Sequence, residues 1–381
     1  MGSESRKSRL LRAVKETDLF LLSVMLVTCI YGFLLVYSVS YTNGTGLRGC
    51  LMQLISLVAG LIAAAIVSFV PYKRIVSLWP VLAGGAVLLM LLTFTPLGIN
   101  VPGTDDTAWL GISVGSFSVS VQPSELLKIV FIITFSKHLS IVHERINSPM
   151  VLLALLAHGL FPTALVFLQG DDGTATIFAL IIVGMLFAAG LHPLYFLGGF
   201  AGIAALIPFV WSHLTPDKQA RFLCIFFVDR YAATEGWQQS LALSSIGSGG
   251  LHGLGWLQGD GSGLYARNND MIFTVAGEEF GFIGAVAVLL MLGLILLAVY
   301  RNARRAKSRV GSYMCIGMMC YIGFQAVINI GMNLRLLPIV GITLPFFSAG
   351  GTSLATLLLG MGLIFSVHRF SSEERRESRF H

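Results

Sequence analysis

The stretch GFIGAVAVLLMLGLILLAVY, residues 281–300, decides the fold class of this chain. It runs for twenty residues without a charged side chain, and about 20 apolar residues in a helix are enough to cross a hydrocarbon core roughly 30 Å thick. The stretch therefore predicts a transmembrane helix. Similar apolar runs recur along the sequence, so we expect this helix to be one of several.

The composition favours a membrane protein with many spans. Hydrophobic residues make up 55% of the 381 residues and charged residues only 12%, whereas about a quarter of a soluble domain is charged. The first run is too long for a signal peptide and lacks a cleavage site, so we expect a retained span. Spans are predicted near residues 19–42, 51–70, 76–96, 123–138, 150–168, 174–190, 194–213, 271–300, 312–332 and 350–368. The sequence thus predicts an all-α polytopic membrane protein of about ten transmembrane helices, with residues 19–368 as one membrane domain.

The positive charges predict the orientation of these spans. Eighteen of the 25 Lys and Arg residues fall on one side of the ten-span arrangement, as they do in cytoplasmic loops. They occupy residues 6–15, 73–74, 137–145, 301–309 and 369–379. Both termini are therefore expected in the cytoplasm, as a basic tail over 1–18 and a charged tail over 369–381. The net charge of +6 then reflects topology and anionic lipid headgroups, and no nucleic acid is expected as a partner.

Missing motifs disfavour several classes of function. None of the five cysteines forms a CxxC pair, so we expect small packing residues rather than disulfides or zinc ligands. GSGGLHGLG, residues 247–255, is rich in glycine but fits neither the dinucleotide-binding nor the phosphate-loop spacing. No nucleotide or organic cofactor is therefore expected.

Two segments on the opposite, extracytoplasmic side are longer than the other loops. Residues 97–122 are polar and acidic and contain no Lys or Arg. Residues 214–270, between the seventh and eighth predicted spans, contain Trp237, Trp256 and many glycines. Because long loops on a compact membrane protein are commonly functional, we expect the chemistry on this side of the membrane.

Three acids lie where the longer loop meets the eighth predicted span. Asp270 is expected near the helix N-terminus, Glu278 about two turns deeper on a similar face, and Glu279 turned away from it. Three carboxylates cannot all be ionised cheaply in one dry place, so they need a cation, an aqueous cavity or raised pKa values. Asp270 is either a capping residue or a general base at the water–membrane boundary, near the basic Arg267.

A charged pair begins the fourth predicted span, in QPSELLK, residues 122–128. Pro123 suits the first turn of a helix, where its missing N–H has no consequence. Glu125 and Lys128 are three residues apart and share a helical face. Burying either charge alone would be costly, so we expect a pair that is either structural or lines a polar cavity.

Two other stretches place polar groups near predicted helix ends. In LQGDDGTAT, residues 168–176, Asp171 and Asp172 precede a helix that one of them is expected to cap. In NIGMNLRLLPIVGITLPFFSAGGTS, residues 329–353, prolines and glycines break any continuous helix, which at membrane depth requires burial in protein or a cavity. Arg335 lies in this segment and suits either phosphate recognition or pairing with an acid.

These stretches together resemble the SEDS family, the FtsW/RodA/SpoVE proteins of bacterial cell-wall synthesis. QPSELLK resembles the signature QPSExxK, QGDDGT resembles QPDLGT, and WQQSLALSSIGSGGLHGLGW resembles xxQSxxAIGSGGxxGxG. NDMIFTVAGEEFGF resembles DFIFAVxGEExG, and the segment at 329–353 resembles NIGMxxGLLPxTGIPLPFxSYGGSS. The motifs keep the family's order. Residues 265–269 depart from the usual Pro-Glu-x-His-Thr, and Arg335 stands where glycine is common.

The resemblance implies a peptidoglycan glycosyltransferase that polymerises lipid II, an undecaprenyl-diphosphate-linked disaccharide-peptide. It implies an active site at the outer face of the bacterial cytoplasmic membrane, in cell elongation, division or sporulation. The family's catalytic aspartate falls on Asp270 and its Glu/Lys pair on Glu125 and Lys128. Other matched positions are expected to bind substrate or line a structural polar cavity: Asp171, Gln239, Ser240, Arg335 and Ser348. The implied partner is a class B penicillin-binding protein, a transpeptidase.

Glycosyl transfer by this class of enzyme needs a base and positive charge. The acceptor 4-hydroxyl is a poor nucleophile, and Asp270 would serve as its general base. The leaving diphosphate needs a cation. Candidates are Mg²⁺ or Mn²⁺, for which carboxylate oxygens such as those of Asp270 are suitable ligands, and the basic residues Lys128, Arg221, Arg267 and Arg335.

Two alternatives stay open at the level of sequence. A lipid II flippase or other lipid-linked transporter would use the same charged groups along a path through the midplane, where Glu278 and Glu279 lie deeper than Asp270. No inverted repeat of the kind common in transporters is evident. A non-catalytic scaffold for a transpeptidase would tolerate the substitution Asp270→Asn.

Overall fold

Apolar helices dominate the structure, a computed structural model that describes residues 16–42, 47–99, 107–114, 117–231, 233–260 and 263–377. Within these ranges, eight helices are long and apolar enough to cross a membrane. They are α2 (Leu19–Thr42), α3 (Leu47–Ser68), α6 (Pro123–Val142), α7 (Pro149–Leu168), α9 (Pro193–His213), α13 (Ile272–Arg305), α14 (Arg309–Asn333) and α15 (Gly351–Glu377). This confirms the helical membrane fold.

Two shorter apolar helices, α5 (Trp79–Leu92) and α8 (Asp172–Ala188), coincide with the remaining predicted spans. A total of ten spans therefore stays a prediction. α15 continues to Glu377, so the helix extends into the predicted C-terminal tail. The basic N-terminal tail, up to residue 15, lies outside the described residues.

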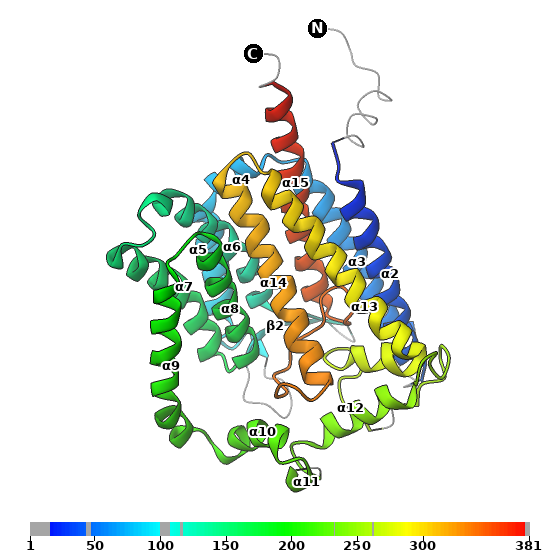
Figure 1. Cartoon of the computed structure of the whole chain (residues 1–381). Coiled ribbons are helices and arrows are strands. Elements are labelled where there is room, and N and C mark those ends of the chain that lie inside the picture. The colour runs from blue at the N-terminus through cyan, green and yellow to red at the C-terminus, as the bar shows by residue number, and fades with distance from the viewer. Residues whose placement is uncertain are drawn as a thin grey trace, which may run out of the picture.

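The two ends of the bundle differ in what they carry. Figure 1 shows the chain termini at one end, together with α4 (Tyr72–Ser77) and the turn between α13 and α14. The basic residues at 73–74 and 301–309 belong to these elements. The loop helices α10 (Pro216–Phe226), α11 (Val228–Tyr231) and α12 (Trp237–Ser248) lie at the opposite end (Figure 1). The structure thus groups the basic loops with the termini, as the sequence predicts.

The core forms around α14, which packs against α13, α8 and α6. Close approach depends on small residues: a Cβ added at Gly317 would lie within 3.0 Å of Ile132 and Met185 side-chain atoms. A Cβ at Gly184 would lie 2.5 Å from the Cys320 sulfur. All five cysteines are buried, as expected of small packing residues.

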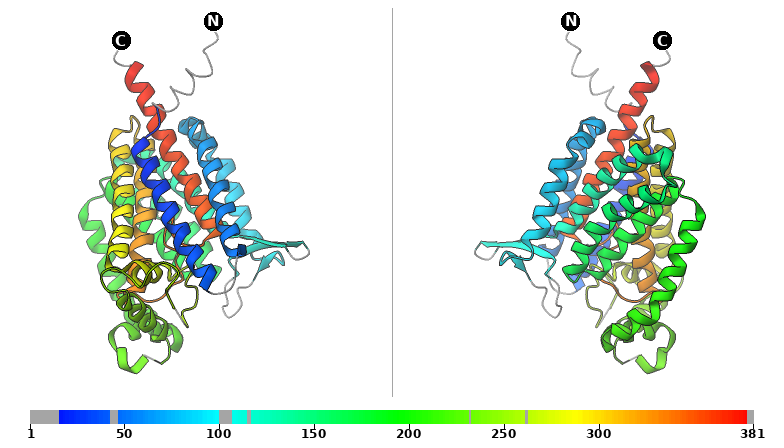
Figure 2. Two further views of the ribbon diagram at one scale, coloured as in Figure 1. Left: turned by 90° about the vertical axis from the view of Figure 1, so that its right-hand side faces the viewer. Right: turned by 90° about the vertical axis from the view of Figure 1, so that its left-hand side faces the viewer.

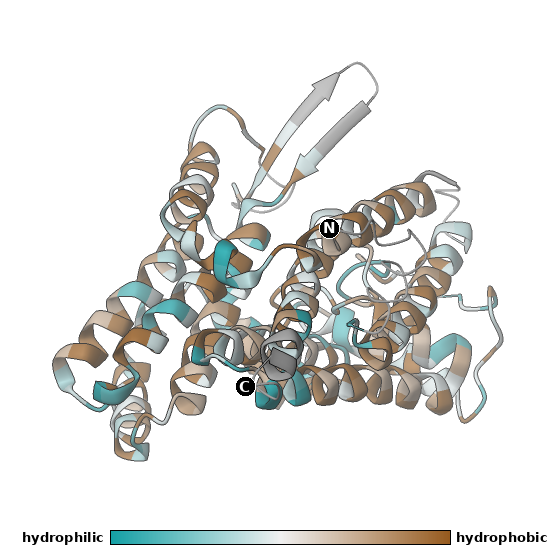
Figure 3. Cartoon of the chain, turned by 90° about the horizontal axis from the view of Figure 1, so that it is seen from above, coloured by the Kyte–Doolittle hydropathy of each residue, from teal (hydrophilic) through white to brown (hydrophobic). Residues whose placement is uncertain are grey.

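The outer surface of the bundle is apolar, as a protein surrounded by hydrocarbon requires (Figure 3). α9 is the extreme case, because none of its residues is buried. It stands at the left edge of Figure 1, with side chains such as Phe200 and Ile203 more than 60% exposed. In water such a surface would drive aggregation, so these helices are suited to a bilayer.

A small antiparallel sheet, which the sequence reading did not predict, interrupts the helical fold. Its strands are β1 (Gly98–Ile99), β2 (Trp109–Val114) and β3 (Phe117–Val121), and the pairing joins Leu110 to Val121. The β2–β3 hairpin projects sideways from the bundle (Figure 2). The run FSVSV alternates polar and apolar residues in the manner of a strand. Within the predicted polar loop 97–122, residues 100–106 and 115–116 lie outside the described residues.

Two breaks in the helical structure lie in the region of the site. α13 changes direction at Gly281, whose φ of 66° only glycine adopts readily. Residues 334–350, between α14 and α15, form no helix, which confirms the effect expected of their prolines and glycines. Both breaks lie toward the end of the bundle that carries α12, because α13 begins there and α14 ends there (Figure 1).

Candidate active site

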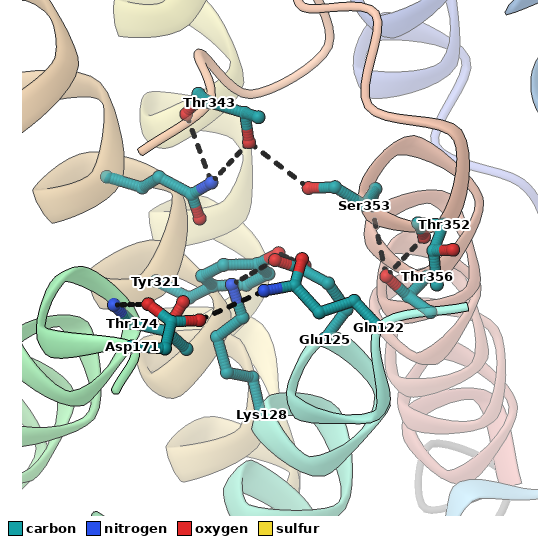
Figure 4. Close-up of polar contacts among 11 residues, drawn as sticks. Gln122, Glu125, Lys128, Asp171, Thr174, Tyr321, Thr343, Thr352, Ser353 and Thr356 are labelled. Atoms are coloured by element: carbon teal, nitrogen blue, oxygen red, sulfur yellow. Dashed lines mark hydrogen bonds and ion pairs between the residues drawn. The ribbon is translucent and has the colours of Figure 1, made fainter. Parts of the chain in front are cut away.

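The buried pair Glu125–Lys128 lies in the first turns of α6, which begins at Pro123 as predicted. Lys128 Nζ donates to Glu125 Oε1 at 2.8 Å, and the two residues are only 1% and 4% exposed. The Tyr321 hydroxyl of α14 donates to Glu125 Oε2 at 3.0 Å, and Lys128 Nζ lies 4.5 Å from the centre of the same ring. Figure 4 shows this group between helices. The structure confirms the expected pairing and adds Tyr321, which the sequence reading missed.

Asp171 joins the start of α8 to the start of α6. Its Oδ1 accepts a hydrogen bond from the Thr174 amide at 2.8 Å, the cap that the sequence predicts. Its Oδ2 accepts from Gln122 Nε2 at 3.0 Å, immediately before α6 (Figure 4). The neighbouring Asp172 instead forms an exposed ion pair with Lys218 at 2.6 Å. Asp171 is thus the inward acid of the two.

A polar cavity of about 30 Å³ lies among these groups and has space for one or two water molecules. Its lining includes Gln122, Glu125, Lys128, Thr174, Gln325, Gly341 and Thr343. Gln325 Nε2 donates to the carbonyl and hydroxyl of Thr343 at 3.0 and 2.9 Å. Four separate parts of the chain therefore converge on one small polar space inside an apolar bundle.

Asp270 lies next to Gly341, one of the residues that line this cavity. A Cβ placed on Gly341 would lie 3.8 Å from Asp270 Oδ2, and the glycine has a φ of +66°. Asp270 lies before α13 and is partly exposed. Burial raises the pKa of Asp270 from 3.8 to about 6, and the carboxylate of Asp171 adds to the rise. The structure thus brings Asp270 to the same site as Asp171, with a carboxyl group suited to exchanging protons near neutral pH.

The backbone that leads into Asp270 is fixed by the segment before α15. The Asn268 carbonyl accepts a hydrogen bond from the Ala349 amide at 2.8 Å. The Asn269 carbonyl accepts one from Ser348 Oγ at 2.6 Å. Ser348, predicted to bind substrate or line a polar cavity, therefore acts on the backbone beside Asp270.

Two buried asparagines that the sequence reading did not single out complete this support. Asn329 Nδ2 and Asn333 Nδ2 donate to the Asp270 carbonyl at 2.8 and 2.9 Å. Both belong to α14 and are 0% exposed. Their spacing of four residues places them on one face of the helix, and two amides in an apolar span are themselves a functional signal. The two asparagines of the motif NIGMN could therefore have been singled out from the sequence.

Glu278 and Glu279 have partners other than Asp270. Glu278 forms a buried ion pair with Arg267 and accepts from the Asp260 amide at 3.1 Å. Glu279 accepts from the Ser38 hydroxyl of α2. Of the three acids at the start of the eighth predicted span, Glu278 and Glu279 therefore lie in a different environment from Asp270. Arg267 pairs with Glu278 and not with Asp270.

Gln239 lies fully buried in α12 and fastens that helix to the end of α14. Its Nε2 donates to the carbonyls of Met332 at 3.1 Å and Leu337 at 2.6 Å. Both acceptors are backbone groups, so the structure gives this predicted site residue a contact that orders the loop.

Arg335 makes a second connection to the same loop region. Its Nη1 donates to Ser240 Oγ at 3.1 Å and its Nη2 to the Cys224 carbonyl at 3.0 Å. Among the described residues it forms no ion pair with an acid. Its φ of +59° is unusual for a residue with a Cβ, which explains why glycine suits this position.

Comparisons with known proteins agree with this geometry. The family model described as cell cycle protein FTSW_RODA_SPOVE matches residues 18–373. Stage V sporulation protein E of Bacillus subtilis is 30% identical, over 93% of this chain and 97% of the relative. The peptidoglycan glycosyltransferase MrdB of Escherichia coli K12 is 29% identical, over 92% of this chain and 93% of the relative.

Solved structures share the fold along nearly the whole chain. RodA of Thermus thermophilus superposes with a TM-score of 0.67 at 26% identity, over 93% of this chain and 97% of that one. A chain from a peptidoglycan synthase complex, described as coordinating polymerization and crosslinking, superposes with a TM-score of 0.79 at 27% identity, over 93% and 98%. With the family model matching residues 18–373, nearly the whole chain, this chain belongs to the FtsW/RodA/SpoVE family of membrane proteins.

Proposed function

We propose that this protein is a peptidoglycan glycosyltransferase that polymerises lipid II into glycan strands. The observation that carries the proposal is the position of Asp270, a partly exposed acid of raised pKa. It lies near Asp171 and next to Gly341, which lines a polar cavity in an apolar bundle. Two relatives whose names include peptidoglycan glycosyltransferase are 30% and 29% identical to this chain, and they support the proposal.

In the proposed reaction Asp270 acts as the general base. Its carboxylate takes the proton of the acceptor sugar's 4-hydroxyl while the oxygen attacks the anomeric carbon of the donor. The bond between that carbon and the diphosphate oxygen breaks, and the electron pair leaves with the undecaprenyl diphosphate. The products are a glycosidic bond and a protonated Asp270, which releases its proton to water before the next cycle.

The leaving diphosphate needs positive charge that other groups have not already neutralised. Lys128 is paired with Glu125, and Arg267 with Glu278. Arg335 is bound only by uncharged groups, so its charge is retained. We therefore propose Arg335 as a contributor from the protein.

We propose a divalent cation, Mg²⁺ or Mn²⁺, as a second source of positive charge for the leaving diphosphate. No cluster of three or more His, Cys, Asp or Glu side chains suited to a metal occurs among the described residues. Mg²⁺ commonly binds through one or two carboxylates and completes its coordination with substrate phosphates and water. Asp270 and Asp171 would supply those carboxylates, and the cation would neutralise the diphosphate as it departs.

The proposed setting is the bacterial cytoplasmic membrane with the site facing outward. The site lies at the end of the bundle opposite the termini and the basic loops (Figure 1), and basic loops favour the cytoplasmic side. A class B penicillin-binding protein is the proposed partner. A structural neighbour that comes from a complex coordinating polymerization and crosslinking supports that choice.

Purified protein and labelled lipid II test this function directly. We expect glycan ladders on a gel when the protein, a class B penicillin-binding protein and Mg²⁺ or Mn²⁺ are present, and a strong reduction with a chelator. The same preparation in vesicles, tested for lipid II translocation, addresses the transporter alternative. Translocation without ladders would identify a flippase, and neither activity in folded protein with its partner would identify a scaffold.

The rate of polymerisation is expected to fall below about pH 6. Only the ionised form of Asp270 can accept a proton, and burial raises its pKa to about 6. The rate should therefore be nearly pH-independent above about pH 7 and decrease tenfold per pH unit well below about pH 6. Initial rates from about pH 4.5 to 8 measure this profile. A midpoint near 4, the ordinary value for an aspartate, would show that the pKa of Asp270 is not raised during turnover, as expected if a cation binds its carboxylate.

A further inference from the structure

The carbonyl of Asp270 is held from two sides by α14. Asn329 Nδ2 donates both to this carbonyl at 2.8 Å and to the Ile342 carbonyl at 2.6 Å. Asn333 Nδ2 donates to the Asp270 carbonyl at 2.9 Å and to the Asn329 carbonyl at 2.8 Å. Carbonyl oxygens only accept hydrogen bonds, so the NH₂ end of each amide must face them. The orientation of both amides is therefore set by chemistry.

These contacts hold the backbone from which the Asp270 side chain extends. Asp270 lies outside α13, so no helical hydrogen-bond pattern fixes it. Among the described residues, none donates a hydrogen bond to its carboxylate. The side chain is thus positioned through its own backbone, and that backbone is anchored at the carbonyl by Asn329 and Asn333.

Asn329 also sets the distance between the acid and the cavity. By bridging the carbonyls of Asp270 and Ile342, it ties the acid to the turn at Gly341, which lines the cavity. The absence of a side chain at Gly341 leaves Asp270 Oδ2 open on that side. A shift of the bridge would move the carboxylate relative to any group held in the cavity.

We propose that Asn329 and Asn333 are positioning residues for Asp270, which hold its carboxylate at the reach required for removing the acceptor proton. The proposal rests on the proposed function. It assigns the two amides a role in the rate of the chemical step rather than in substrate affinity, because neither touches the open side of Asp270. An error of about 1 Å in the placement of a catalytic group lowers a rate by about 100-fold.

The two amides share one acceptor, which makes a double-mutant test informative. Asn329→Leu or Asn333→Leu alone leaves one donor on the carbonyl, and we expect kcat for lipid II polymerisation to fall about tenfold. The double variant removes both donors, and we expect a fall of about 100-fold or more. KM for lipid II should stay within about twofold in all three, since binding contacts are unchanged.

Asn302→Leu is the matched control. Asn302 is 2% exposed and donates to Asp18 Oδ2 and to the Ala298 carbonyl at the other end of the bundle. It should lose thermal stability comparable to that of the single variants but keep the wild-type kcat. Ser348→Ala is a smaller change beside the same acid. It removes the donor to the Asn269 carbonyl and the acceptor of the Leu344 amide, and it should lower kcat several-fold at unchanged KM.

The results distinguish the positioning role of the two asparagines from the proposed polymerase function on which it rests. Wild-type kcat in the folded leucine variants and in Ser348→Ala would overturn the positioning role while leaving the polymerase intact. A loss expressed mainly as a rise in KM would overturn it as well. If the leucine variants do not fold, the smaller change Asn333→Ala, which removes the same donor to the Asp270 carbonyl, decides in their place. Absence of ladders from the wild type would remove the proposed function and the inference with it.

Discussion

Replacing Asp270 with asparagine is expected to reduce lipid II polymerisation by about 100- to 10,000-fold. The amide has nearly the shape of the carboxylate but cannot accept the proton of the acceptor hydroxyl, and general-base catalysis contributes about 100- to 10,000-fold. The backbone contacts to the Asp270 carbonyl are unaffected, since they come from Asn329 and Asn333. Glycan-ladder assays with matched amounts of wild-type and variant protein, each with its transpeptidase partner, measure the effect.

The same variant should fold at least as stably as the wild type at neutral pH. The pKa of Asp270 is raised to about 6 in the folded protein, above its unfolded value near 3.9. The folded state therefore binds the proton more tightly, and stability falls as the pH rises between these two values. At pH 7 the ionised side chain disfavours folding, and asparagine removes that penalty. A thermal midpoint equal to or above that of the wild type would show that lost activity is not lost structure.

Two results would contradict the role given to Asp270. Ladders of normal length and rate from Asp270→Asn would leave an enzyme with another base or with none. Loss of activity accompanied by a large fall in thermal midpoint would show that the acid is structural. The expected combination, a stable but inactive protein, distinguishes the base from both.

Local rules were enough to predict much of the fold and part of the site. The start of α6 at Pro123, the Glu125–Lys128 pair and the Asp171 cap each follow from residues within one helical turn. Helix positions followed from apolar runs, because the bilayer imposes one length and one polarity on every span. Such features depend on short stretches of sequence and need no knowledge of tertiary contacts.

Contacts between distant segments were not predictable in the same way. The Glu278–Arg267 pair depends on how the loop before α13 folds back over that helix, and the distance between the two residues cannot be read from the sequence. Arg335 pairs with no acid among the described residues but contacts Ser240 and the Cys224 carbonyl, residues about 100 positions earlier, and its expected role toward phosphate stays a prediction. Asn329 and Asn333 were quoted within a motif, but their acceptor at Asp270 became visible only in three dimensions.

Breaking the buried pair at the cavity is the second change expected to have a large effect. Lys128→Met leaves Glu125 as a buried carboxylate whose remaining described partner is the Tyr321 hydroxyl. Removing one member of a buried ion pair destabilises a protein by about 3–5 kcal/mol. We expect a large fall in the thermal midpoint in detergent and no detectable polymerisation. Glu144→Gln with Arg309→Met is the control, because that pair is 76% and 53% exposed at its side chains and should have little effect.

The double variant Glu125→Gln/Lys128→Met separates the structural role of the pair from its functional role. Two neutral side chains of similar shape leave no uncompensated charge, and such replacements of buried pairs are often neutral or stabilising. The thermal midpoint should therefore return close to that of the wild type. Polymerisation should stay below about a tenth of the wild-type rate, because both charges line the same cavity as Gly341, next to which Asp270 lies, and fixed charges at an active site act on the transition state. Full recovery of activity together with stability would mean that the pair only orients α6. The two charges at the cavity would then have no role in the reaction.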